Sequence, residues 1–102
     1  MTNEEKKAIL LKAIEIVKGY PDNRYDRGIC HAIDLATGGR YYFLNSFIKG
    51  LGIVLPEYKY YGAFMIVEEF MYSFPLTKEG DAQRIALLEE AIKKLELWNP
   101  QN

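Results

Sequence analysis

The sequence predicts an all-α fold, a single compact domain of four to five helices that spans residues 1–102. Two observations predict it. Apolar residues recur at helical spacing in the first and last thirds of the chain, and helix start and stop signals bracket both stretches. A chain of 102 residues with 49% hydrophobic and 26% charged residues also has the size and composition of one folded globular domain.

The first helix is predicted over about residues 3–18. Thr2 and Glu5 have the spacing of a capping box, in which each side chain accepts a hydrogen bond from the backbone N–H of the other residue. Gly19 and Pro21 follow the last turn and favour its end there. The apolar positions are Ile9, Leu10, Ala13, Ile14, Ile16 and Val17.

A second helix is predicted from about Arg24 to Thr37, because its apolar positions fall on one helical face and Gly38-Gly39 follows it. These positions are Tyr25, Ile29, Ala32, Ile33 and Ala36. A third helix is predicted from Arg40 to Gly50, with Leu44, Phe47, Ile48 and Leu51 on a shared face.

The last helix is predicted from about Lys78 to Trp98, with the Thr77 hydroxyl as its cap. Its apolar stripe consists of Ile85, Leu88, Ile92 and Leu95, supported by Leu87 and Ala91.

Two segments in the middle of the chain are harder to assign. Residues 53–61 contain Pro56 and are predicted to be an extended connection. Residues 62–72 include a short apolar run that fits either a helix or a strand. Helix is favoured, because helical spacing continues to Phe74 and no second strand is evident for pairing.

Aromatic residues are concentrated between residues 41 and 75, which hold 11 of the 14 in the chain. Phenylalanine has no polar atom, so the five phenylalanines are assigned to the core: Phe43, Phe47, Phe64, Phe70 and Phe74. Tyrosine can cover a core while its hydroxyl reaches water or a partner. We therefore expect Tyr41, Tyr42, Tyr58, Tyr60 and Tyr61 to face a partner.

Arginines and tyrosines form the main candidate binding set. Three of the four arginines lie between residues 24 and 40. Such residues bind phosphates and stack on bases, which suits a nucleotide. They also build protein interfaces or simply cover a core. With His31 added, the set is Arg24, Tyr25, Arg27, His31, Arg40, Tyr41, Tyr42, Tyr58, Lys59, Tyr60 and Tyr61.

Catalysis is not favoured. Cys30 and His31 are adjacent, so on a helix they point about 100° apart and do not face each other. Cys30 is expected to be a buried apolar residue. His31 and Asp34 have the spacing of a hydrogen-bonded pair, which leaves a small hydrolase as a third interpretation. No catalytic residue, metal ligand or cofactor is predicted.

Charge and composition narrow the choice of partners. The net charge of −1 gives no general attraction to extended nucleic acid or to an anionic membrane. The single cysteine fits a reducing cytoplasm, so a cytoplasmic location is expected. No stretch has the length and apolarity of a membrane span.

Two stretches together resemble small all-helical phage and prophage accessory proteins. They are Gly28-Ile29-Cys30-His31-Ala32-Ile33, and Phe74-Pro75-Leu76 followed by Gly80, Arg84-Ile85, Leu88-Glu89 and Ala91-Ile92. The likeness covers about 40 of the 102 residues. It implies a non-enzymatic protein that binds a host protein or sequesters a host signalling molecule.

The function expected from the sequence is therefore a non-catalytic binding protein. A protein partner is favoured, and self-association into a homo-oligomer would fit the tyrosine content. The alternative is a nucleotide-binding or signal-sequestering protein, of the kind that acts against a host defence, using the arginines and tyrosines.

Overall fold

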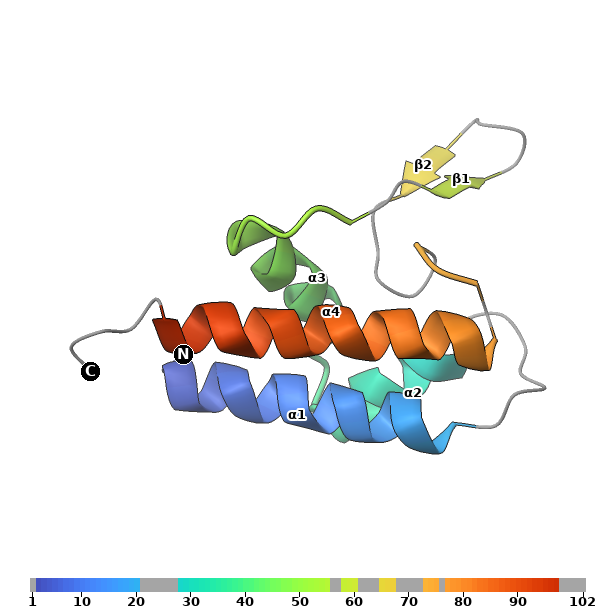
Figure 1. Cartoon of the computed structure of the whole chain (residues 1–102). Coiled ribbons are helices and arrows are strands. Elements are labelled where there is room, and N and C mark those ends of the chain that lie inside the picture. Colours follow the sequence, from blue (N-terminus) through green and yellow to red (C-terminus); the bar gives the residue numbers. More distant parts are fainter. Residues whose placement is uncertain are drawn as a thin grey trace.

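The computed structural model describes residues 2–20, 28–55, 73–75 and 77–97, together with the backbone of residues 58–60 and 65–67. Figure 1 shows α1 and α4 side by side, with α2 and α3 on one side of this pair and the two strands beyond α3. The predicted all-α class is confirmed. The described elements are α1 (Asn3–Gly19), α2 (Gly28–Ala36), α3 (Tyr41–Gly50), β1 (Tyr58–Tyr60), β2 (Met65–Val67) and α4 (Lys78–Leu97).

Helix α1 forms as the sequence predicts. The Thr2 hydroxyl accepts a hydrogen bond from the Glu5 N–H at 3.1 Å, and the Glu5 carboxylate accepts one from the Thr2 N–H at 2.7 Å. This capping box satisfies two N–H groups that a helix start leaves without intrahelical partners. The side chains that α1 buries in the core are Leu10, Ala13, Ile14 and Val17.

Helices α1 and α4 run antiparallel, and a polar contact joins them at each end. The Lys7 ammonium lies 2.8 Å from the Glu96 carboxylate. At the other end, the Lys78 ammonium donates a hydrogen bond to the Tyr20 carbonyl at 2.6 Å. The two contacts link opposite ends of both helices and match one relative register of α1 and α4 (Figure 1).

The buried face of α4 is rotated from the predicted stripe. Leu88 and Leu95 are buried as predicted, but Ile85 and Ile92 are only partly buried at its edge. Arg84 is fully buried in place of Ile85. Its Nη1 donates to the Asp81 carboxylate at 2.9 Å, and its Nη2 donates to the Phe74 carbonyl at 2.6 Å. The core therefore accepts a cation whose donors reach a carboxylate and a backbone carbonyl among the described residues.

The corner between α2 and α3 depends on two glycines. Gly38 and Gly39 have φ of 67° and 84°. Their N–H groups donate to the carbonyls of Leu35 and Asp34, respectively, which is the Schellman pattern of helix termination. The predicted end of the second helix is thereby confirmed. Residues 24–27 of that prediction lie outside the described residues.

After α3 the chain is extended, as predicted. Ile53 and Leu55 are buried while Val54 is 84% exposed. This alternation is the two-residue period of an extended backbone. It returns two aliphatic side chains to the core that α1, α2 and α4 share.

Strands β1 and β2 correct one prediction. They pair antiparallel, with Tyr58 opposite Val67, Lys59 opposite Ile66 and Tyr60 opposite Met65. The predicted helix is therefore wrong for Met65–Val67, and the rest of residues 62–72 lies outside the description. The apolar run finds its partner in the segment just before it, which the sequence marks as an extended connection. Apolar spacing alone does not separate a short strand from a helix.

Candidate binding site

The structure describes the side chains of only part of the predicted Arg/Tyr set. Arg24, Tyr25, Arg27 and Tyr61 lie outside the described residues. Tyr58, Lys59 and Tyr60 are described through the backbone of β1 alone. The side chains that can be placed are those of His31, Arg40, Tyr41 and Tyr42.

These four side chains do not share one environment. His31, Arg40 and Tyr42 are exposed. Tyr41 is 1% exposed and belongs to the core, so the prediction that it faces a partner is wrong. The reason is its place at the start of α3, where its N–H donates to the Asp34 carboxylate at 3.1 Å and draws α3 against α2.

The same contact bears on the proposed His31–Asp34 pair. Asp34 holds the α2–α3 corner through its side chain and through its carbonyl, which accepts from Gly39 N–H at 2.7 Å. Cys30 is 3% exposed in the core, which confirms the prediction of a buried apolar residue. Asp34 thus has a structural role that the sequence interpretation did not include.

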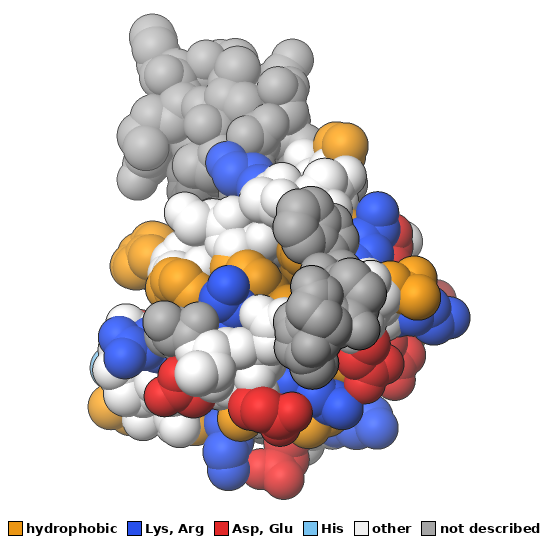
Figure 2. Space-filling view, turned by 90° about the vertical axis from the view of Figure 1, so that its left-hand side faces the viewer, with side chains coloured by type: hydrophobic (Ala, Val, Ile, Leu, Met, Phe, Trp, Pro, Cys, Tyr) orange, Lys and Arg blue, Asp and Glu red, His pale blue; other side chains and the backbone are white. Residues whose placement is uncertain are grey.

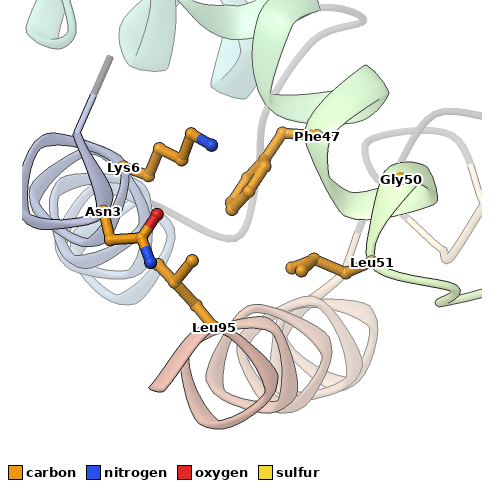
Figure 3. Close-up of a pocket in the computed structure, with 6 residues that line it drawn as sticks. All are labelled: Asn3, Lys6, Phe47, Gly50, Leu51 and Leu95. Carbon is orange, nitrogen blue, oxygen red and sulfur yellow. The ribbon is translucent and has the colours of Figure 1, made fainter. Parts of the chain in front are cut away.

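A different site is present at the end of the molecule where α1 begins and α4 ends. A pocket of about 240 Å³ opens there. Figure 3 shows side chains from three helices directed toward it. Its walls are Phe47, Gly50 and Leu51 at the end of α3, Leu95 of α4, and Asn3 and Lys6 of the first turns of α1.

The pocket has an apolar interior and a polar rim. Leu95 is 5% exposed and forms part of the core as well as of the wall. Phe47 and Leu51 are half-buried and pack against the same core. The Lys6 ammonium and the Asn3 carboxamide supply the polar atoms. A concave apolar surface with a few polar groups at its edge is the usual form of a protein binding site.

The Phe47 ring is held in position by two contacts. Phe43, one turn earlier on α3, stacks on it with a centroid distance of 5.9 Å and an interplanar angle of 3°. The Lys6 ammonium lies 5.3 Å from the ring centroid, within the range of a cation–π interaction. Because both contacts limit rotation of the ring, the aromatic wall is preorganised.

The charged side chains around the pocket differ in whether they contact a partner among the described residues. The hydrogen bond from Lys7 to Glu96, followed by their charge attraction, raises the pKa of Lys7. The hydrogen bonds that Glu5 makes with the Thr2 backbone and side chain lower the pKa of Glu5. Lys6 forms no ion pair within the described residues. It is therefore a cation at this pocket that is available to a ligand.

Figure 2 views the molecule from this end. Hydrophobic side chains gather at mid-height toward the left of this face, with basic side chains beside them. Acidic side chains gather below and to the right. Part of the apolar surface of this end is therefore exposed beside basic side chains.

Sequence reasoning missed this pocket. It assigned Phe47 to the core and gave Lys6 and Asn3 no role. Lys6, Phe47 and Leu95 lie far apart along the chain, and no local spacing links them. The one signal in the sequence was the place of Phe47 at the edge of its helix. That place indicates a pocket only when the ends of α1 and α4 are known to meet there.

Comparisons with known proteins add no relative. A scan against protein-family models, a search of curated proteins and a search of solved structures each gave no match to this chain. The resemblance to phage accessory proteins therefore stays a prediction.

None of the helices in the described residues combines the length and apolar composition needed to cross a membrane. Within the same residues, no three His, Cys, Asp or Glu side chains are grouped so that they could hold a metal ion.

Proposed function

We propose that this chain is a non-catalytic binding protein that acts on a protein partner, and that the partner inserts an apolar side chain into the pocket between α1, α3 and α4. The observation that carries the proposal is the pocket itself, with its preorganised Phe47 ring and the buried Leu95 in its wall. Protein interfaces draw most of their affinity from a few anchor side chains in such pockets.

The size of the pocket supports a side chain as the occupant. A volume of about 240 Å³ exceeds the roughly 150 Å³ of an engineered cavity that holds benzene. It can therefore take a phenylalanine or leucine side chain. Burying such a side chain contributes about 1.5–3 kcal/mol. A contribution of this size fits one anchor side chain within a larger interface. It is too small to be the whole free energy of binding.

The resemblance to phage and prophage proteins supplies a biological setting for the proposal, in which the partner is a host protein. The nucleotide alternative draws less support, because Tyr41 is committed to the core. A nucleotide would need phosphate-binding cations, and among the described residues that line the pocket Lys6 is the one cation.

The test uses two matched glycines. Gly50 and Gly19 are each the last residue of a helix, are exposed and have open space where a Cβ would stand. Gly50 lines the pocket, whereas Gly19 lies at the opposite end of α1. Gly50→Phe should place a ring at the rim and obstruct entry, while Gly19→Phe adds the same ring elsewhere.

Each protein is immobilised and exposed to lysate from the cells in which the chain occurs, and retained proteins are quantified by mass spectrometry. We expect a protein that the wild type and Gly19→Phe retain and that Gly50→Phe loses. Equal retention by all three would refute the proposal. A thermal-shift screen with nucleotides runs in parallel, since a ligand bound only to the folded state raises Tm. A clear shift would favour the alternative.

A further inference from the structure

We propose that the pocket recognises an apolar side chain that has a carboxylate directly beside it, as at the carboxyl terminus of a polypeptide. The inference rests on the proposed function and names the chemistry of the anchor. The side chain would occupy the space between Phe47, Leu51 and Leu95, and the carboxylate would pair with the Lys6 ammonium at the rim.

Lys6 is placed to serve both parts of such a ligand. Its ammonium lies over the Phe47 ring, 5.3 Å from the centroid, and both residues line the pocket. A group stacked in the pocket would therefore lie within a few ångströms of the ammonium. In Figure 3 the Lys6 and Phe47 side chains point toward one another, with Leu51 and Leu95 on the other sides of the pocket.

The acidic residues of this end are directed to other groups. The Glu96 carboxylate accepts a hydrogen bond from Lys7 at 2.8 Å. The Glu5 carboxylate accepts one from the Thr2 N–H at 2.7 Å. The charge of Glu4 acts on Lys7 and contributes to the raised pKa of its ammonium. Lys6 is thereby left without a neutralising carboxylate in the described part of the chain, so the pocket presents one positive charge to a ligand.

The polar group beside Lys6 fits the same ligand. The Asn3 carboxamide lies at the rim and carries both donor and acceptor atoms. Its amide N–H could donate to a carboxylate, and its carbonyl could accept from a backbone N–H of the partner. A carboxyl-terminal residue presents both of these groups next to its side chain.

The test is a set of three small probes that vary the apolar group and the charge separately. N-acetylphenylalanine carries both the ring and the carboxylate. N-acetylphenylalaninamide keeps the ring and lacks the charge, whereas N-acetylglycine keeps the carboxylate and lacks the ring. Each is titrated into the ¹⁵N-labelled chain, and the amide shifts of the pocket residues are followed by NMR.

We expect N-acetylphenylalanine to bind about threefold more tightly than the amide, in the range measured for a solvent-accessible ion pair. N-acetylglycine should leave the pocket amides unshifted at the same concentrations. Lys6→Met keeps most of the apolar stem of the side chain and removes the charge. It should make the two phenylalanine probes bind equally, while Gly50→Phe should weaken both.

Equal binding of the two phenylalanine probes to the wild type would overturn the inference, as would an unchanged preference in Lys6→Met or the absence of pocket shifts. These failures differ from failure of the proposed function. If the lysate experiment gives a protein that depends on Gly50 while the probes bind equally, the function stands and the carboxylate preference falls. If the probes behave as expected and no protein depends on Gly50, the site takes a free small carboxylate instead.

Discussion

Removing the Asp81 carboxylate should take from the buried Arg84 guanidinium the countercharge that it contacts among the described residues. The side chains of Arg84 and Asp81 are 0% and 4% exposed, and their atoms lie 2.9 Å apart. Arg84 also donates to the Phe74 carbonyl, which ties residues 73–75 to α4. In Asp81→Ala the guanidinium keeps the Phe74 carbonyl and loses the Asp81 carboxylate.

The expected cost follows from the burial. Breaking a buried ion pair by removing one partner costs about 3–5 kcal/mol, because the remaining charge is desolvated without compensation. Replacing both partners by apolar groups of similar volume is often close to neutral. Asp81→Ala and Arg84→Met should each lower the free energy of unfolding by about 3 kcal/mol, and the double variant should lose much less than the sum of the two.

Urea unfolding of the wild type, both single variants and the double variant measures this coupling. Glu90→Ala, an exposed position on the same helix, is the control and should change stability by less than about 0.5 kcal/mol. A loss under about 1 kcal/mol in Asp81→Ala, together with additive effects in the double variant, would refute the reasoning from burial.

Three other changes test the packing and the helix caps. Gly80→Ala should destabilise the chain, although alanine is the better helix former, because a Cβ there would overlap the Pro75 carbonyl. Gly19→Ala, with open space around it, should instead be neutral or stabilise by up to about 1 kcal/mol in urea unfolding; equal effects of the two changes would contradict the observed packing. Thr2→Ala should cost about 0.5–2 kcal/mol, measured the same way at pH 7. Since the folded pKa of Glu5 is lowered from 4.5, its contribution is present above pH 4.5 and is lost as pH falls through the folded value. The difference in stability between wild type and Glu5→Gln should therefore shrink over that acidic range, and a constant difference would count against a charged capping box.

The helices were the most predictable part of the fold. Helix α1 begins and ends within a residue of the prediction because its signals are local: the Thr2–Glu5 box at the start and Gly19 at the end. Gly38 and Gly39 likewise end α2 through their own backbone conformation. Each of these signals acts over a few residues and can be recognised without knowledge of the rest of the chain.

The exact buried faces were less predictable. Helical spacing predicted an apolar stripe on α4 with Ile85 at one end, and the structure buries Arg84 there instead. A charged residue enters the core only when distant atoms satisfy its donors, here including the Phe74 carbonyl. Tyr41 was wrongly predicted to face a partner, because the spacing of nearby residues does not show the contact between its N–H and Asp34.

The sequence alone determined the all-α class, the ends of α1 and the stop after α2, because caps, glycines and apolar periodicity act within one or two turns. Only the tertiary structure decided that β2 finds a partner in β1, that Arg84 belongs to the core, and that Lys6, Phe47 and Leu95 share a pocket. The pocket depends on residues far apart along the chain, and all three features form only when helices and strands come together.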